Sequence, residues 1–212
     1  MSVIAGQTET WPDEVIQLLD DQHLVVVTDR AASGERFGDA LIRRLTQMGE
    51  TQVIVLDGEA VTDVPSFCRL VELQTLSRAA RKQLPHAKTF WRDAQSVINV
   101  LRQPGGAETK HRYFIWHKAD AMLRRDPVLF NHLVNAMLGV AAEQEHIAPD
   151  SLVIQRLVLI GGESLQAFAE DQNSALNRWQ DEEGSPLWEV ASVLERPPVA
   201  TYRLERAEAK QQ

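Results

Sequence analysis

The sequence predicts an α/β fold, a three-layer sandwich in which helices cover both faces of a mostly parallel sheet. Five short apolar runs have the length and composition of β-strands, and segments of helical periodicity separate them. No hairpin signal joins one run to the next, so each connection should cross over and bring the next strand in parallel.

The predicted strands are short runs rich in β-branched and other apolar residues. They are Leu24 to Val27, Gln52 to Leu56, Tyr113 to His117, Arg156 to Ile160 and Val199 to Leu204. Turn signals follow the second and fourth of these runs, at Asp57-Gly58 and Gly161-Gly162. Each of these two strands is therefore expected to end in a tight turn.

Helices are predicted wherever apolar residues recur at intervals of three and four. These segments are Trp11 to Asp20, Phe37 to Met48, Val64 to Gln83, Ala87 to Leu101, Asp120 to Leu123, a long stretch from Pro127, Ser164 to Trp179, and Leu187 to Leu194. Residues 1–204 then form a single domain, which is an ordinary size for one hydrophobic core. Residues 205–212 are predicted to be a polar C-terminal tail.

Composition excludes several classes of protein. A hydrophobic content of 44% with 25% charged residues is that of a globular domain and not of a disordered or fibrous chain. No apolar run is long enough to span a membrane, and the N-terminus lacks a signal-peptide pattern, so a cytoplasmic location is expected. Cys68 is the only cysteine, and the six histidines lack metal-site spacing, so no metal centre is predicted.

Charge is distributed unevenly along the chain. The net charge is −8, yet the segment from Arg78 to Arg125 holds eleven basic and three acidic residues, which leaves −16 for the remainder. Such asymmetry can indicate an anionic partner such as nucleic acid. The alternative is that these cations lie on solvated helix faces and pair with the acidic remainder. The candidate anion-binding residues are Arg81, Lys82, Lys88, Arg92, Lys110, Arg112, Arg124 and Arg125.

The segment after the first strand has the outline of a phosphate-binding loop. In a GxxxxGK[ST] loop, backbone amides and a lysine hold the phosphates and a hydroxyl binds magnesium. In that register Gly34 keeps the second glycine, whereas Asp29, Glu35 and Arg36 replace the first glycine, the lysine and the hydroxyl. Two acidic side chains would repel a triphosphate. An ordinary strand-to-helix turn is the alternative interpretation.

The third strand and the residues after it read YFIWHKADAML over positions 113–123. This segment resembles the magnesium-binding strand of the AAA+ family of P-loop ATPases, an apolar run followed by D-E-A-D-A-L. Asp120 fits that pattern, whereas His117 and Lys118 stand at the positions of the metal-linked aspartate and the catalytic glutamate. A lysine opposes a hard cation, and without a carboxylate base the attacking water has no orienting partner.

Two later segments are similar to the same family. Residues 156–164, RLVLIGGES, resemble its fourth strand and sensor, with Ser164 in place of an asparagine. Residues 175–179, ALNRW, resemble the A-L-x-R-F segment that in relatives places an arginine near a neighbour's nucleotide, here Arg178. A surface arginine on an amphipathic helix is the alternative for Arg178.

The resemblance extends from Leu24 to Leu204 and implies a P-loop NTPase-like sheet with strand order 5-1-4-3-2, without the C-terminal lid. It implies a non-catalytic scaffold or adaptor that acts through protein–protein contacts, with an intact ATPase as partner. ATP and magnesium are disfavoured as cofactors because the reacting residues are replaced.

Three alternatives stay open. The protein could bind nucleic acid or another polyanion through its basic segment. It could be an atypical nucleotide binder or NTPase that uses Arg30 or Arg36 in place of the lysine. The sheet could also be flavodoxin-like, with Asp29 and Asp57 at the ends of its first two strands.

Overall fold

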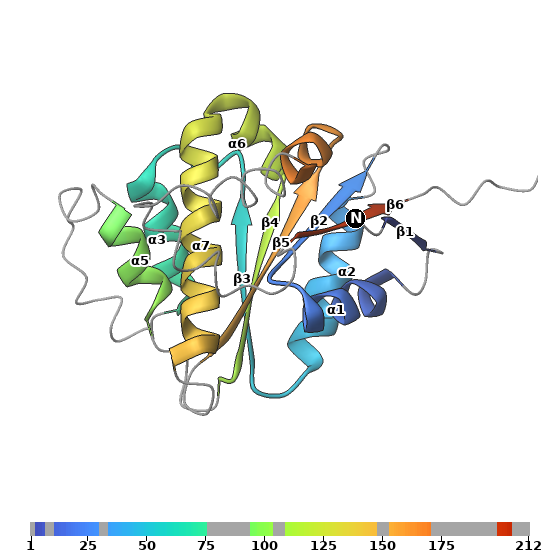
Figure 1. Ribbon diagram of the computed structural model, residues 1–212, viewed down its shortest axis with the longest axis horizontal. Coiled ribbons are helices and arrows are strands. Elements are labelled where there is room, and N and C mark those ends of the chain that lie inside the picture. Colours follow the sequence, from blue (N-terminus) through green and yellow to red (C-terminus); the bar gives the residue numbers. More distant parts are fainter. Residues whose placement is uncertain are drawn as a thin grey trace, which may run out of the picture.

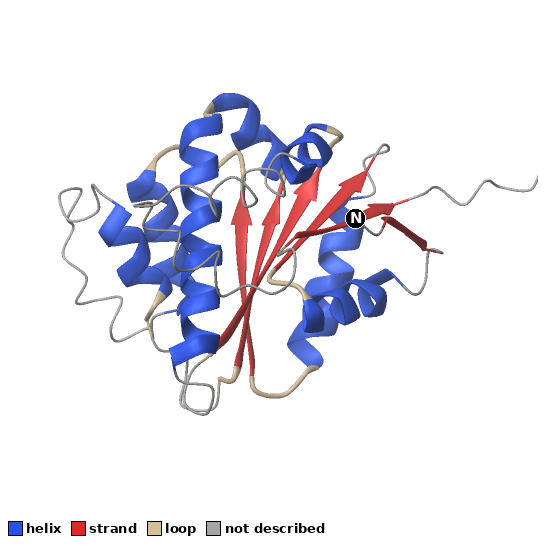
Figure 2. Ribbon diagram, in the orientation of Figure 1, coloured by secondary structure: helices blue, strands red, loops and turns tan. Residues whose placement is uncertain are grey.

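The computed structural model describes residues 3–6, 11–29, 34–75, 94–103, 109–147, 153–170 and 199–204 (Figures 1 and 2). The strands are β1 Val3–Gly6, β2 Leu24–Asp29, β3 Thr51–Asp57, β4 His111–His117, β5 Ile154–Gly161 and β6 Val199–Leu204. The helices are α1 Trp11–Asp21, α2 Gly34–Gln47, α3 Val64–Thr75, α5 Ala94–Leu101, α6 Ala119–Arg125 and α7 Pro127–Ile147.

The six strands form one parallel sheet in the order β1-β6-β2-β5-β4-β3. The five predicted strands stand in the predicted order 5-1-4-3-2, so the α/β class, the parallel pairing and the strand order are confirmed. The first predicted strand, β2, lies between β5 and β6. A flavodoxin-like sheet would place it between the second and third strands, so that alternative is wrong.

Strand β1 is an addition that the sequence did not predict. Its four residues pair in parallel with β6, with Val3 opposite Thr201 and Gly6 opposite Leu204. The run VIAG is too short to show a strand period. Its partner also comes from the far end of the described chain, which no local pattern can show.

Several predicted helices are described only in part. The helix predicted from Val64 ends at Thr75 in the described structure, and α5 begins at Ala94; residues 76–93 lie outside the described chain. Residues 164–170 are helical, whereas the rest of the helix predicted to Trp179 lies outside the description. The same holds for the segments 187–194 and 205–212.

Two hydrophobic clusters lie on opposite faces of the sheet. Leu24 and Val26 of β2 join the cluster formed with α3, α5 and α7, whereas Val25 and Val27 join the cluster formed with α1 and α2. Figure 1 shows the same division of the helices about the sheet. Because both faces are covered, the central strands read as continuous apolar runs and not as alternating ones.

The larger cluster is centred on the fully buried Trp116 of β4. Its ring centroid lies 5.2 Å from that of Phe130 on α7 and 6.1 Å from that of Phe67 on α3. These contacts fix both helices against the same strand. Aromatic pairs at such distances add about 0.5–1.5 kcal/mol beyond the area that they bury.

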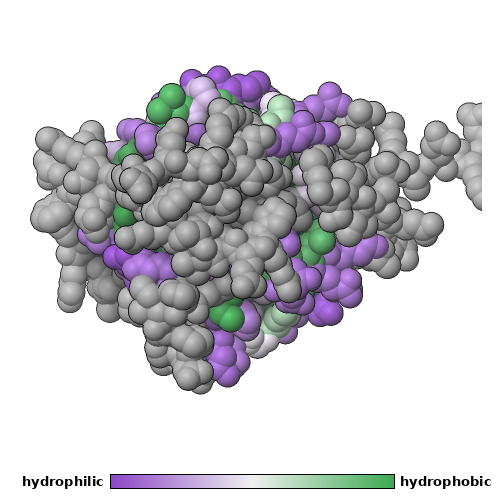
Figure 3. All heavy atoms as spheres, in the orientation of Figure 1, coloured by the Kyte–Doolittle hydropathy of each residue, from purple (hydrophilic) through white to green (hydrophobic). Residues whose placement is uncertain are grey.

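Outside the core, the described surface is mainly hydrophilic in the view of Figure 3, with apolar side chains in separate small areas. The large hydrophobic residues exposed in the described chain are Leu73 on α3 and Val128 on α7. None of the described helices combines the length and the apolar character needed to cross a membrane.

Glu72 on α3 gives the stability of the fold a pH dependence. Burial raises the pKa of this carboxyl above the ordinary 4.5, and a hydrogen bond with the Gln103 side chain lowers it in part. The folded protein therefore holds the proton more tightly than the unfolded chain. Its stability should fall as the pH rises from 4.5 through the raised pKa.

We expect Glu72→Gln to remove this loss. The variant should gain unfolding free energy relative to wild type at about pH 8, and gain less at about pH 4, where wild-type Glu72 is mostly protonated in both states. Urea denaturation at the two pH values measures the difference. An equal effect at both would contradict the assignment.

Candidate functional site

The sequence motifs meet at the carboxyl edge of the sheet, because parallel strands end on the same side. Thr28 at the end of β2 is paired with Gly161 of β5, and Asp57 of β3 is paired with His117 of β4. In open α/β sheets this edge is the usual ligand position. It is the candidate functional site of this protein.

The positions that resemble a phosphate loop lie at the junction of β2 and α2. Asp29 is the last residue of β2, and Gly34 and Glu35 open α2. Arg36 follows in the first turn, with an exposed side chain. The predicted strand–turn–helix is confirmed at its two ends, whereas residues 30–33 and the side chains of Asp29 and Glu35 lie outside the description.

His117 packs its imidazole against the backbone of α2. A Cβ atom added to Gly38 would lie 1.9 Å from the His117 Cε1 atom and 2.7 Å from its Nδ1 atom. Glycine at position 38 therefore leaves the room that the ring occupies. His117, which stands at the position of the metal-linked aspartate in the AAA+ pattern, thus fills the space between β4 and α2.

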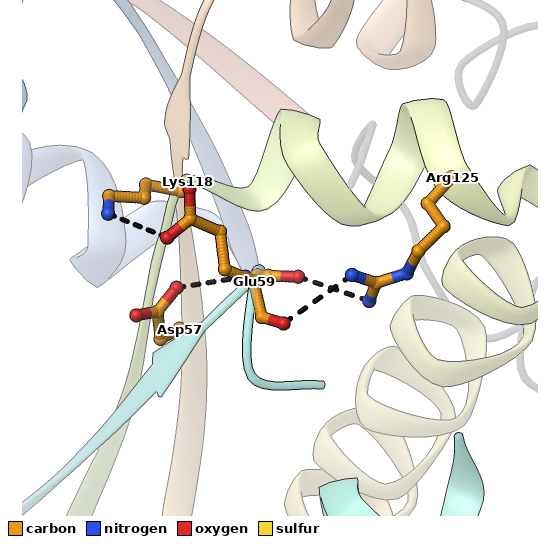
Figure 4. A network of polar contacts seen from close by, with 5 residues as sticks. Asp57, Glu59, Lys118 and Arg125 are labelled. Carbon is orange, nitrogen blue, oxygen red and sulfur yellow. Dashed lines mark hydrogen bonds and ion pairs between the residues drawn. The ribbon is translucent and has the colours of Figure 1, made fainter. Parts of the chain in front are cut away.

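Lys118, at the position of the catalytic glutamate, is joined to the β3 side of the sheet (Figure 4). Its Nζ donates to the Glu59 carboxylate at 3.0 Å, and both side chains are partly exposed. Its backbone is left-handed, with φ 48° and ψ 35°. This conformation turns the chain from β4 directly into α6.

The turn after β3 packs against the junction of β4 and α6, at His117 and Lys118. The Gly58 N–H donates to the His117 carbonyl at 2.8 Å, and the Asp57 carboxylate accepts from the Glu59 N–H at 2.9 Å. A Cβ on Gly58 would lie 2.0 Å from the Lys118 carbonyl oxygen. The two chain turns are thus in backbone contact, which requires glycine at position 58.

Arg125, on the last turn of α6, holds the other side of this turn. Its guanidinium donates to the carbonyls of Gly58 at 3.3 Å and Glu59 at 3.4 Å (Figure 4). It also donates to the carbonyl of Val61. Lys118 and Arg125 together hold residues 58–61 against the end of β4 and against α6. Both cations therefore serve internal contacts.

Asp120 faces the glycine pair at the end of β5. A Cβ on Gly161 would lie 2.4 Å from one carboxylate oxygen of Asp120, and a Cβ on Gly162 would lie 3.3 Å from the other. Arg124, one helical turn further on, forms an ion pair with the same carboxylate. The acidic residue that fits the family pattern is thus packed against β5 and neutralised by its own helix.

In the part of the chain that the structure describes, two hydroxyl groups at this edge are buried and have no hydrogen-bond partner. They are Oγ1 of Thr28, a residue only 3% exposed, and Oγ of Ser164, the sensor-like residue after β5. The sequence did not predict Thr28 as a site residue, because it directly follows the apolar run LVVV and has the character of a strand residue. Buried polar groups without partners are uncommon and are candidates for ligand or water contacts.

The basic segment is largely committed to internal contacts where it is described. Ion pairs join Arg102 to Glu143, Lys110 to Glu50, Lys118 to Glu59 and Arg124 to Asp120, while Arg125 binds carbonyl groups and Arg112 is buried. The remaining five cations of the segment, and the arginine-finger-like Arg178, lie outside the description; the five are Arg78, Arg81, Lys82, Lys88 and Arg92.

Arg112 is a correction to the predicted anion-binding set. Its side chain is 0% exposed and donates to the carbonyls of Leu101 at 3.0 Å and Gln103 at 2.8 Å, and to the Gln52 side chain at 2.8 Å. Burial lowers its pKa to about 10, so the guanidinium still carries its charge at neutral pH. It caps the end of α5 from within the core and offers no surface to an anion.

The described part of the chain contains no group of three or more His, Cys, Asp or Glu residues placed to hold a metal ion. Comparison of the chain with models of known protein families gave no match, and a search of curated proteins gave none either.

Lys118 provides a test of the strained turn. Lys118→Gly and Lys118→Ala both remove the ion pair, but only glycine relieves the left-handed conformation. We expect the glycine variant to be more stable than the alanine variant by about 1 kcal/mol in urea denaturation. Glu59→Ala is the matched control, because it breaks the exposed pair from the other side and should cost less than about 1 kcal/mol. Equal stabilities for the two Lys118 variants would contradict a strained turn.

Proposed function

We propose that this protein is a non-catalytic scaffold or adaptor module of the AAA+ type, with a P-loop NTPase-like three-layer fold that acts through protein–protein contacts. The observation that carries the proposal is the ion pair between Lys118 and Glu59. A cation bound to a neighbouring loop stands where the family resemblance expects the catalytic carboxylate.

The surrounding contacts support the same proposal. An attacking water needs a carboxylate base, and a magnesium ion needs oxygen ligands with negative charge. Asp120 is the acid on this segment, and its carboxylate is engaged by Arg124. His117 is packed against α2. These residues stabilise the junction of β3, β4 and β5, as a scaffold requires.

The first experiment measures ATP turnover and ATP binding with magnesium. We expect no phosphate release above the protein-free blank and no thermal shift at millimolar nucleotide. Glu35→Ala is the matched variant, because its position corresponds to the lysine of a phosphate loop. Hydrolysis by the wild type that the Glu35 change abolishes would contradict the proposal, whereas hydrolysis that survives the change indicates a contaminating ATPase.

The second experiment addresses the partner, which we propose is an intact ATPase. Any intact ATPase that is encoded beside this protein in its genome is the candidate to purify and mix with it. We expect a complex of defined mass and a changed turnover rate of that ATPase. A mixture that runs as two separate species with an unchanged rate would count against this partner.

Nucleotide binding without efficient hydrolysis is a second candidate function, favoured by the unpartnered hydroxyls of Thr28 and Ser164. Calorimetry with ATP and magnesium tests it. Binding that is weakened by Thr28→Val and by Ser164→Ala would support this candidate over the scaffold proposal. The absence of heat at millimolar ligand would exclude it.

Polyanion binding is a third candidate, favoured by the charge asymmetry of the chain. Because the described cations of the basic segment already have carboxylate or carbonyl partners, the test addresses Arg81, Lys82, Lys88 and Arg92. Changing these four to glutamine should weaken any retention of DNA or RNA and reduce its salt dependence. Absence of retention at low ionic strength by the wild type would exclude this candidate.

A further inference from the structure

The β3 edge of the sheet has an unusual side-chain contact. β3 is the last strand of the sheet in the described part of the chain, so no described strand lies beside it on one side. At that edge the Gln74 side chain of α3 bonds to both main-chain groups of Val55: its Oε1 accepts from the Val55 N–H at 2.8 Å, and its Nε2 donates to the Val55 carbonyl at 2.8 Å. A primary amide thus takes the place of one residue of an adjacent strand.

The direction of the other β3 groups follows from the pairing with β4. The Glu50 carbonyl accepts from the β4 side, at the Lys110 and His111 amides, and the Gly58 N–H donates to His117. Even-numbered positions therefore bond to β4, and the odd-numbered positions 51, 53, 55 and 57 face away from it. The Asp57 carbonyl already accepts from the Ala60 and Val61 amides within the turn.

Gln74 therefore occupies the outward groups of position 55 and shortens the open edge of β3. With Gln74 in place, the outward groups left between the start of β3 and Val55 are those of positions 51 and 53. Without it, the outward groups of 51, 53 and 55 would form a continuous edge of about five residues, the usual length of a strand. Such an edge accepts further strands.

We propose that Gln74 closes the β3 edge against strand addition, and that removing its amide lets this edge pair with the β3 edge of a second copy. The second copy is the occupant because two identical edges can pair antiparallel about a twofold axis, and every copy carries the complementary groups. The inference is independent of the function proposed above. It assigns Gln74 a role in keeping copies of this protein apart.

The test compares the mass of wild type and Gln74→Ala by sedimentation or light scattering over a micromolar concentration series. We expect the variant to double the mass of the wild-type species at high concentration and to match it at low concentration. Gln47→Ala, on an exposed position of α2, is the control and should keep the wild-type mass throughout. A Gln74→Ala protein that keeps the wild-type mass at all concentrations would overturn the proposal.

A second variant locates the new contact. Val53→Pro removes an outward N–H, which an edge strand tolerates, and should restore the wild-type mass when it is combined with Gln74→Ala. A double variant that still doubles in mass would show that pairing occurs elsewhere and would also overturn the proposal.

Hydrogen exchange on the wild type tests the closure without any substitution, and therefore holds even if Gln74→Ala fails to fold. The Val55 amide should be protected, because it donates to Gln74, whereas the Val53 amide on the same edge should exchange faster. Equal, fast exchange at both positions would show that Gln74 does not close the edge.

Discussion

Replacing Gly58 with alanine should lower the unfolding free energy of this protein by about 3 kcal/mol, one of the two largest effects that we expect from a single change. The added Cβ would lie 2.0 Å from the Lys118 carbonyl oxygen and 2.8 Å from its carbonyl carbon. Both are backbone atoms, so no side-chain rotation can relieve the clash. The turn after β3 would have to separate from β4, with loss of the Gly58–His117 hydrogen bond.

Urea denaturation measures this effect, and Gly49→Ala is its matched control. Gly49 follows α2, and a Cβ added there meets no atom within 4 Å. We expect the control to stay within about 0.5 kcal/mol of wild type. Similar stabilities for the two variants would show that β3 and β4 do not approach as closely as described.

Replacing Arg112 with methionine should cost about 3 kcal/mol for a different reason. The change keeps an apolar chain of similar length but removes every donor of the guanidinium. The Gln103 carbonyl and the Gln52 side chain would each lose a partner, whereas the Leu101 carbonyl would keep its hydrogen bond from Gln155. Both acceptors are partly buried, so each would lose its hydrogen bond without full hydration in its place.

Two comparisons make the Arg112 result specific. Arg112→Lys should also destabilise the protein, because one ammonium cannot reproduce the fork that reaches three acceptors. Arg43→Met is the control on an exposed position, where the side chain makes a 3.2 Å contact to the Asp39 carbonyl, and it should change the stability by less than about 0.5 kcal/mol. A near-neutral Arg112→Met would contradict the assignment of Arg112 as a buried cap.

Much of the fold could be predicted from sequence because its signals are local. The run LVVV requires a strand covered on both faces, and the spacing of Phe37, Leu41 and Leu45 requires a helix with one buried side. The strand order came from the family resemblance and not from periodicity. Strand β1 was missed because four residues carry no period and their partner is β6.

The candidate site was predictable in position but not in its contacts. The motif residues mark the ends of β2, β4 and β5, and parallel pairing brings these ends to one edge. The sequence does not tell which carboxylate Lys118 meets, because Glu59 lies 59 residues earlier in the chain. The sequence likewise predicted Arg112 as a surface cation, because its three acceptors are distant in the chain. They lie in α5, in the residues after α5 and in β3.

The sequence by itself determined the α/β class, the strand-and-helix alternation and the replacement of charged residues at the positions of the resemblance, since each depends on residue type and short-range spacing. Only the tertiary structure decided which partners individual polar groups have. Lys118 forms an ion pair with Glu59, Arg112 is buried in the core, and Gln74 bonds to Val55 on the edge of β3. The physical reason is that hydrogen bonds and ion pairs form between atoms a few ångströms apart, and strand register decides which distant residues come that close.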